Sequence, residues 1–521
     1  MVFLNQFMKS QAPISSVGFS QSANPAVADL NSGDGSVPEN SDPAAHTLPK
    51  MVGIVTGPRW SICPFSKNTN GAAGTMSHTD EFPTLADTCD FLKSLEKPSV
   101  AQLLADAKRA GTVAVQARSG VGSHAQMVDL LSKIENEASP DILTITIDSY
   151  SRLCMFDDAH RILHTNPAEL NGYPLVAHGW RRGRELNRLT KQPLDIRHGS
   201  PVADRLFETA IASGITSFEG GGVSYNLPYA KRVPLEASIG SWRKIDRLCG
   251  ELAGRGIIVS REMFGTLTAV LIPPSTSLAI SFLEAISAAR DGVQCLLIAY
   301  PQGGNALQDI AALRSIDVLA RRYLPSGPPV YPVLHQYMGP FPRDRARASA
   351  LILLGGLVAK LGGATKVVTK TYEEAFGIPT AEANIDGIRL TRCALARMFD
   401  FIELDESAIA EEMHWIEREV AELIDPIVGA TDLHGAIIEA FNEGRLDVPF
   451  SPSIYTRKEV MSVRDPQGAI RYLSCDKLPF SENTRRRNRE MLRETAAPQE
   501  QFREILSSIY FLGDKSDEYQ P

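Results

Sequence analysis

The sequence predicts an α/β protein whose main unit, over residues 83–400, is a (β/α)8 barrel of the TIM type. Short apolar runs rich in β-branched residues alternate there with segments such as 99–111 and 310–324. In those segments apolar residues recur three and four positions apart, as in amphipathic helices. Strands that alternate with helices form parallel βαβ units, and a repeat of this kind closes into a barrel.

Nine runs are candidate strands. In chain order they are TVAVQA (112–117), ILTITI (142–147), PLVAH (174–178), PLDIRH (193–198), GITSFE (214–219), GIIVSRE (256–262), VQCLLIAY (293–300), PPVYPVLHQY (328–337) and ATKVVTK (364–370). Because the barrel takes eight strands, we expect one run to lie outside it or not to be a strand.

The two flanks differ from this pattern. Residues 1–82 are rich in Ser, Asn, Pro, Gly and Ala, so they can bury little and are predicted to be a disordered, low-complexity extension. Residues 401–521 are predicted to form a smaller helical and mixed C-terminal region packed on the barrel. It opens with a long amphipathic helix at 404–429 that has an acidic face. For the basic run at 485–490 a solvated helix face is favoured over a partner contact.

Composition excludes several classes of protein. The 521 residues carry a net charge of -8, which provides no basic field for nucleic acid. The seven cysteines are scattered without a CxxC pair, which fits a reducing cytoplasm and neither a disulfide framework nor a zinc ribbon. No apolar run reaches the roughly 18 residues of a membrane span, and the N-terminus lacks a secretory signal. The sequence thus predicts a soluble cytoplasmic protein with no nucleic-acid or membrane partner.

Polar side chains directly follow the predicted strands. They are Arg118, 148–152, Arg197, His198, Glu219, Arg261, Glu262, Tyr300, His335 and Lys370. The carboxyl ends of barrel strands form one rim, where active sites are built, so we expect these side chains to converge.

The segment FEGGGVSYNLPYAKRV (218–233) stands out among these strand ends. Glu219 can bind an ammonium group or act as a base, while Tyr225 and Tyr229 offer rings and hydroxyl groups. The three glycines would let the backbone approach a large ligand, and Pro228 would stiffen the loop. The alternative is a surface loop anchored by its aromatic residues.

Arg118, Arg152 and Arg197 follow three different strands. A guanidinium binds a carboxylate bidentately, and we expect that three of them without carboxylates of their own need an anion in the site. A small dicarboxylate with an ammonium group matches three arginines, Glu219 and two tyrosines. A sugar phosphate also satisfies the arginines but explains the glutamate less well.

Metal-ligand patterns are weak, and no metal is predicted. His160 and His164 stand four residues apart but lack the glutamate of HExxH. The stretch TDLHGAI (431–437) begins like the cobalt-ligating DxHxxG, yet position 437 is Ile.

Longer motifs resemble, in the same order, the epsilon subunit of glutamate mutase, also called methylaspartate mutase. They are RHGSP (197–201), TSFEGGGVSYNLPYAK (216–231), REMFGTLTAVLIPP (261–274), QDIAALRS (308–315), HQYMGPFP (335–342), GATKVVTKTYEEAFGIPTAEAN (363–384) and VRDPQGAIRYL (463–473). The resemblance covers about residues 85–515. It implies a (β/α)8 barrel whose rim faces a separate, flavodoxin-like small subunit that carries DxHxxG and binds adenosylcobalamin. The missing glycine at 437 is then explained, because the partner holds the cobalt ligand.

The resemblance also implies roles for single residues. Arg118, Arg152 and Arg197 would hold the substrate carboxylates, and Glu219 would take the ammonium; these four are the implied catalytic set. Substrate contacts would also come from His198, Tyr225, Tyr229 and Phe264. Cofactor contacts would come from Gly120, Asn171, Pro228, Phe341, Lys370, Glu374 and Ile378, and the glycines near Pro228 would let the corrin and adenosyl groups sit close.

The implied reaction interconverts L-glutamate and (2S,3S)-3-methylaspartate by a radical mechanism, in a homodimer of this chain that carries two small subunits. The sequence departs from the family at Met263 and Thr266, at 302–305, at 153–169 and at 179–192. A mutase for another glutamate-like substrate is therefore an alternative. A cobalamin-independent lyase or isomerase with a barrel fold, and a relative that only binds, are the other two.

Overall fold

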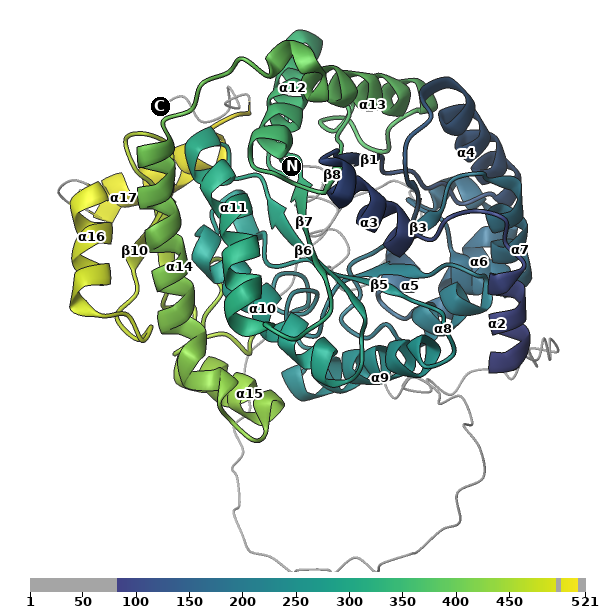
Figure 1. The fold of residues 1–521 in the computed structure, drawn as a ribbon, viewed down its shortest axis with the longest axis horizontal. Helices are drawn as coiled ribbons and strands as arrows, with labels where there is room; N and C mark the ends of the chain where they lie inside the picture. Colours follow the sequence, from purple (N-terminus) through teal and green to yellow (C-terminus); the bar gives the residue numbers. More distant parts are fainter. Residues whose placement is uncertain (1–81, 493–497, 514–521) are drawn as a thin grey trace, which may run out of the picture.

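A computed structural model of the chain describes residues 82–492 and 498–513. Almost all of the predicted N-terminal extension, 1–82, thus lies outside the described residues. The centre of the molecule is one sheet of eight parallel strands (Figure 1). They are β1 (Ala114–Gln116), β2 (Leu143–Thr146), β3 (Leu194–Arg197), β4 (Ser217–Glu219), β5 (Ser260–Met263), β6 (Cys295–Pro301), β7 (Val330–His335) and β8 (Lys366–Val368).

Neighbouring strands pair in sequence order from β2 to β8, and β8 pairs with β1. A parallel bridge between Gln116 and Ile142 then connects β1 to the start of β2, so the sheet closes on itself. The predicted (β/α)8 barrel is confirmed.

Helices surround the strands (Figure 1). They are α2 (Leu85–Lys93), α3 (Val100–Ala110), α4 (His124–Ala138), α5 (Ser149–Arg152), α6 (Phe156–Thr165), α7 (Leu175–Leu189), α8 (Asp204–Ala212), α9 (Leu235–Ala253), α10 (Pro274–Arg290), α11 (Ala306–Tyr323), α12 (Arg345–Leu361) and α13 (Ala381–Leu395). Single 3-10 turns lie at Pro167–Glu169, Thr268–Val270 and Arg397–Phe399. The helices predicted at 99–111 and 310–324 are confirmed as α3 and α11.

One of the nine strand predictions is wrong. The run at 174–178 leads into helix α7, which begins at Leu175. The reason is that β2 and β3 pair directly, Leu143 with Leu194 through to Thr146 with Arg197, which leaves no gap in the sheet for another strand. A five-residue apolar run fits a buried helix turn as well as a strand.

The amino-terminal end of the barrel is filled by apolar residues. Val100 and Leu104 of α3 are buried in one cluster with strand residues such as Leu297 and Val333. Helix α3 precedes β1 and lies across this end of the barrel (Figure 1). Apolar side chains therefore close the amino-terminal end of the barrel interior, and the polar side chains lie toward the opposite end.

The C-terminal part adds α14 (Glu406–Val428), α15 (Leu433–Glu443), the hairpin β9 (Met461–Arg464) and β10 (Ile470–Ser474), α16 (Glu482–Leu492) and α17 (Pro498–Ile509). The predicted amphipathic helix is α14, which packs on α10 and α11. In the basic run 485–490, Arg486 and Arg489 lie on a solvated face as predicted. Arg487 does not: it is buried and pairs with Glu412 of α14 at 2.7 Å.

None of the helices in the described part of the chain combines the length and the apolar character that a membrane crossing requires.

Candidate active site

The candidate site lies at the carboxyl ends of the strands. Its pocket is lined by side chains from segments that end or follow six of the eight strands. They are Arg118 after β1, Arg197 and His198 at β3, Glu219, Tyr225 and Tyr229 at β4, Phe264 after β5, His335, Gln336 and Met338 at β7, and Val368 and Lys370 at β8. The predicted convergence on one rim is confirmed for Arg118, Arg197, His198, Glu219, His335 and Lys370. It is wrong for Arg261, whose guanidinium pairs with Asp246 of α9, and for Tyr300, whose hydroxyl group donates to Asp309 of α11.

The deepest part of the site is a layer of charged groups, which we call the inner layer. It consists of Asp195, Arg197, Glu219, Glu262, His335 and Lys366. Each of these side chains is at least 97% shielded from solvent. Strand register contributes to this gathering, because Glu219 lies directly opposite Glu262 on the neighbouring strand.

Arg197 is at the centre of the inner layer. Its guanidinium forms an ion pair with Glu219, lies 3.3 Å from Glu262 and 3.5 Å from Asp195, and approaches Nε2 of His335 at 2.9 Å. The expectation that the three arginines lack carboxylates of their own is therefore wrong for Arg197. Burial opposes its charge, but Glu219, Glu262 and Asp195 outweigh burial and raise the pKa of Arg197 above its ordinary value.

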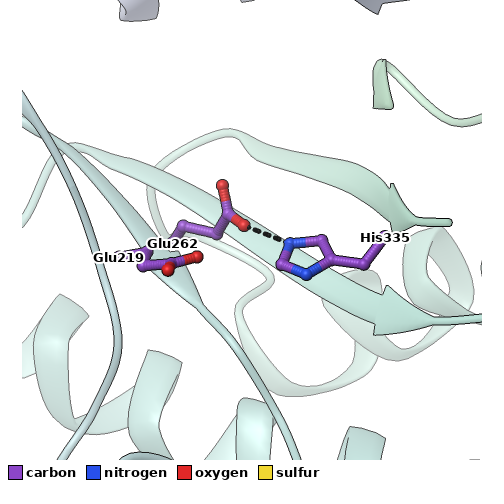
Figure 2. Close-up of side chains that lie close together, drawn as sticks. All are labelled: Glu219, Glu262 and His335. Atoms are coloured by element: carbon purple, nitrogen blue, oxygen red, sulfur yellow. Dashed lines mark hydrogen bonds and ion pairs between the residues drawn. The ribbon is translucent and has the colours of Figure 1, made fainter. Parts of the chain in front are cut away.

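Glu262 is the most tightly held acid of the layer. Its carboxylate pairs with the ammonium group of Lys366 and lies 2.7 Å from Nε2 of His335 (Figure 2). Burial alone would raise its pKa, but Lys366 and Arg197 outweigh burial and hold the pKa of Glu262 well below its usual range. Burial and the nearby Arg197 lower the pKa of His335 to about 3, so its imidazole is neutral.

Glu219 behaves in the opposite way. Burial is the largest cause, and the neighbouring carboxylates of Glu262 and Asp195 add to it, so that despite Arg197 the pKa of Glu219 rises to about 7. Two carboxylates at one site cannot both be fully stabilised by a single guanidinium. Glu219 is thus the acid of the layer that can still gain from a further cation.

Donor atoms of Glu219, Glu262 and His335 lie within 4.8 Å of one another, a spacing at which three side chains could hold a metal ion. However, Arg197 and Lys366 already pair with both carboxylates. A metal ion would have to be accommodated beside two fixed cations, so the chemistry of this donor set fits an ion-pair network better.

A second group of charges lies nearer the mouth: Arg118, Arg152, Lys370 and Glu374. Lys370 pairs with Glu374 at 2.6 Å, and burial followed by the charge of Arg118 lowers the pKa of Lys370 despite this pair. Arg152 is half-buried and donates its Nε–H to the carbonyl of Ile147. Burial, and next the repulsion of Arg118, lower the pKa of Arg152, so these two guanidiniums are close neighbours. The mouth is therefore rich in positive charge.

Aromatic side chains form one wall. The ring of Tyr225 meets that of Tyr229 edge-on at 5.8 Å and lies 5.2 Å from Phe264. His198 stacks on Trp242 at 5.7 Å, donates through Nε2 to the Glu219 carbonyl and accepts from the Ser200 N–H at Nδ1. Burial and the neighbouring Arg152 hold the pKa of His198 well below its usual range. His198 is therefore a neutral support for this wall.

The glycine triplet packs against the protein itself. A Cβ atom would lie 2.3 Å from the Tyr225 ring at Gly220, 2.2 Å from the Glu284 carboxylate at Gly221 and 2.7 Å from the Ile239 Cα at Gly222. The interpretation that these glycines make room for a ligand is wrong for these faces, because α9 and α10 occupy them. The carboxylate of Glu284 also accepts the N–H groups of Val223 and Ser224, at 2.8 and 2.9 Å.

The residues expected to contact a cofactor all lie at the carboxyl ends of strands. Gly120 fits against β2, where a Cβ atom would lie 2.5 Å from the Thr146 carbonyl oxygen. Asn171 accepts the Ser149 N–H at 2.8 Å, and Phe341 is buried with Val270 and Tyr337 below the surface. Pro228 lies in the loop after β4, and Ile378, beyond β8, is exposed.

Met263, the last residue of β5, and Thr266, which follows the strand, do not line the pocket. Met263 lines a separate cavity of about 30 Å³ between α9, α10 and α15, and the Thr266 N–H bonds to Ser277 of α10. Neither residue is therefore in a position to set the size of the candidate pocket. At 302–305, the N–H groups of Gly303 and Gly304 donate to Asp309, which makes this stretch a structural turn.

Sequence reasoning missed Trp242, Glu284 and Lys366, and it gave Glu262 no role. Trp242 and Glu284 lie in the middle of helices α9 and α10, where pattern analysis predicts only helix. Lys366 lies inside a strand prediction, and a lysine within an otherwise apolar run was the one signal that could have marked it.

Fold and site together define an α/β-barrel protein with a pocket lined by charged side chains at the carboxyl end of its strands. The methylaspartate mutase E chain family matches residues 96–516, and the chain belongs to this family. The protein named glutamate mutase epsilon subunit from Halobacterium salinarum is 39% identical over 438 residues, which cover 82% of this chain and 91% of that one. Its namesake from Desulfitobacterium hafniense is 39% identical over 79% of this chain and 87% of its own length.

The protein of the same name from Escherichia coli O157:H7 is 41% identical over 73% of this chain and 81% of its own length. Among solved structures, an N-(5'-phosphoribosyl)anthranilate isomerase from Pyrococcus furiosus aligns with 54% of this chain and 99% of its own length. Its TM-score of 0.30 and identity of 11% are too low to bear on fold or function.

Proposed function

We propose that this chain is the catalytic component of an adenosylcobalamin-dependent glutamate mutase. It would interconvert L-glutamate and (2S,3S)-3-methylaspartate together with a separate cobalamin-binding small subunit, as an isomerase. Membership of the methylaspartate mutase E chain family and the names of its relatives support the reaction. The site supports the substrate class independently.

The observation that carries the proposal is the buried ion pair of Arg197 and Glu219. Both side chains line the pocket, so a charged ligand that enters the pocket competes with this pair for its two partners. An amino acid can do so without leaving a charge unpaired, because its carboxylate takes Arg197 and its ammonium takes Glu219. A phosphate ester would satisfy Arg197 and leave Glu219 facing an anion.

The second carboxylate of glutamate would lie toward Arg118 and Arg152. These neighbouring guanidiniums repel each other, and an anion between them relieves that repulsion. With both ends of the substrate anchored, a fragment formed during rearrangement stays in position to recombine. Tyr225, Tyr229 and Phe264 would exclude water from the reacting carbon atoms.

The rim fits a large cofactor and a partner protein. Apolar side chains are exposed on loops near the mouth: Leu153 (45%) after β2, Phe376 (65%) and Ile378 (46%) after β8, and Ile454 (56%), whose N–H bonds to Lys231 beyond β4. Such side chains are covered when a flat, partly apolar group and its carrier subunit dock there.

When bound, adenosylcobalamin supplies the radical that removes a hydrogen atom from the substrate. On this chain, Lys370 and Glu374 would hold its ribose, and Gly120, Asn171, Pro228, Phe341 and Ile378 would form the surface beneath it. Two copies of the chain would pair, each with one small subunit. The six cysteines of the described part form no disulfide, which supports a cytoplasmic location.

Reconstitution tests the proposal. The purified chain is mixed with a cobalamin-binding small subunit, adenosylcobalamin and L-glutamate, and product is followed by proton NMR. We expect 3-methylaspartate, and none when either protein or the cofactor is omitted. A cobalamin complex that forms without product would exclude glutamate as substrate. Thermal stabilisation by phosphate esters but not by glutamate would instead favour a cobalamin-independent barrel enzyme.

A further inference from the structure

We propose that Glu262 and Lys366 are positioning residues that keep the inner layer one cation short, so that the site selects a substrate that brings an ammonium group to Glu219. This inference rests on the proposed function, because it explains how the same site recognises an amino acid. It concerns two side chains that do not line the pocket themselves.

The geometry makes Glu262 a fixed anion. Lys366, fully shielded from solvent, pairs with one carboxylate oxygen of Glu262, while the other oxygen faces Nε2 of His335 and Nη1 of Arg197. The same oxygen therefore attracts the guanidinium that also pairs with Glu219. Figure 2 shows the carboxyl groups of Glu219 and Glu262 side by side, with His335 beyond. Arg197 is thus shared between two acids from adjacent strands.

The charge count gives the consequence. With all acids ionised, the inner layer holds three carboxylates, of Asp195, Glu219 and Glu262, against the two cations Arg197 and Lys366. His335 adds no charge because its imidazole is neutral. A substrate that brings an ammonium to Glu219 and a carboxylate to Arg197 leaves this deficit at one, whereas a carboxylate alone would raise it to two. Without Lys366 the deficit would be two, and without Glu262 it would vanish.

Glu219 is surrounded by further ionisable groups that any titration must take into account. They are Arg118 and Arg152 toward the mouth, Asp195, Arg197 and His198 from β3, Tyr225 and Tyr229 from its own loop, Glu262 from β5, His335 from β7, and Lys366 and Lys370 from β8. None of these is changed by the two substitutions below except Glu262 and Lys366 themselves.

Infrared spectroscopy of the full-length, ligand-free chain tests the charge count. The difference between the spectra of the wild type and Glu219→Gln separates the band of protonated Glu219 from those of other buried acids such as Glu208 and Asp309, and the pH at which this band disappears is measured. We expect Glu262→Gln to move this pH down, because it removes a like charge beside Glu219. Lys366→Met should move it up, since one of the coupled acids then keeps its proton. The double variant Glu262→Gln/Lys366→Met should return it to near the wild-type value.

A structural role alone cannot give this pattern, because opposite shifts that cancel follow only from charge. Shifts in the same direction, or a double variant further from wild type than either single one, would overturn the inference. Should Lys366→Met alone fail to fold, Glu262→Gln and the double variant still decide it. Glu412→Gln, an equal change at a buried ion pair in the C-terminal part, is the matched control and should leave the band unchanged.

Binding then links the inner layer to the substrate. The wild-type chain should bind L-glutamate more tightly than glutarate, which has both carboxylates but no ammonium. Measured above pH 7, where Glu219 is ionised in both proteins, this preference should fall about tenfold or more in Glu262→Gln, because Glu219 is then already balanced by Arg197 and Lys366. If the variants show the expected infrared shifts but the wild type binds neither compound, the inference about the charge network holds and the proposed substrate is wrong. If the enzyme turns over glutamate but the variants titrate like the wild type, the proposed function holds and the inference is wrong.

Discussion

Two buried clusters of ion pairs in the described part of the chain differ in charge balance. In the C-terminal part, Glu412 and Asp465 face Arg471 and Arg487, two acids against two bases. Burial opposes the charge of Glu412, but Arg471 outweighs it and lowers the pKa of Glu412. In the inner layer of the barrel the acids outnumber the bases, and the pKa of Glu219 is raised to about 7. A balanced cluster is complete without a ligand, whereas an unbalanced one is prepared to receive one.

The largest effect is expected from a substitution in the unbalanced cluster of the inner layer. Glu219→Gln keeps the shape of the side chain but removes the charge that the ammonium requires. We expect kcat/KM for L-glutamate in the reconstituted enzyme to fall about a hundredfold or more, because a hydrogen bond to a charged group is worth about 1.5–3 kcal/mol and orientation is lost with it. The melting temperature should stay at or above that of the wild type. Unchanged kcat/KM would remove Glu219 from the substrate site.

A similar loss is expected at the mouth. Arg118→Lys keeps the positive charge but replaces a planar fork by a single ammonium group, which cannot hold a carboxylate bidentately. Turnover should fall at least about tenfold, with an unchanged circular dichroism spectrum and melting curve. Wild-type kinetics in this variant would mean that Arg118 does not hold the substrate.

Breaking the balanced cluster should affect stability instead. Glu412→Gln leaves Arg471 and Arg487 without their shared carboxylate, and removal of one partner from a buried pair costs about 3–5 kcal/mol. Denaturant unfolding should report this loss, while KM for glutamate in the surviving folded protein stays the same. A large change in KM would show that the two clusters are coupled.

The pH dependence of binding sharpens the comparison. Because the pKa of Glu219 in the folded protein is about 7, against an ordinary value of 4.5, the acid is protonated below pH 7 and cannot accept an ammonium. Binding of L-glutamate should therefore weaken about tenfold per pH unit below 7 and level off above it. The free energy of unfolding should change with pH in the direction opposite to that of a salt-bridged acid. Because Glu219 binds a proton more tightly in the folded state, its contribution to the free energy of unfolding is lost as pH rises from 4.5 to 7. Calorimetry checks the first statement and urea unfolding the second, with Glu219→Gln as the flat reference in both.

The smallest effect concerns the loop that carries the aromatic wall. Gly221→Ala places a methyl group against the Glu284 carboxylate, which must then move away from the Val223 and Ser224 N–H groups. We expect a loss of about 1–3 kcal/mol of stability and a higher KM. Gly240→Ala in α9, where a Cβ atom meets nothing within 4 Å, is the control and should be neutral or slightly stabilising. Equal behaviour of the two variants would contradict the packing role of the triplet.

The sequence was sufficient for the barrel and for the residues that face its mouth. Strand periodicity and the polar residues at strand ends, such as Arg118, Glu219 and Lys370, predicted both, because parallel strands bring their carboxyl ends together whatever their order. The roles of these residues as substrate or cofactor contacts stay predictions.

Contacts between strands and helices distant in the sequence could not be predicted. That Arg197 would meet Glu262, which pairs with Lys366, depends on the register of β3, β5 and β8. The purpose of the glycine triplet depends on Glu284, sixty-three residues beyond Gly221. The run at 174–178 was predicted to be a strand and starts helix α7 instead, because five residues are too few to show the period that separates a helix from a strand.

Because α3 closes the amino-terminal end of the barrel with apolar side chains, it limits how water, protons and small molecules reach the barrel interior. Val100 and Leu104 close the amino-terminal end of the barrel, so the charges of the inner layer face solvent through the mouth. Water, protons and small molecules must then all reach the inner layer through the mouth. A partner that docks over the mouth therefore controls the entry and exit of all three. One such cover would suffice to shield a reactive intermediate from water and to delay release of the product.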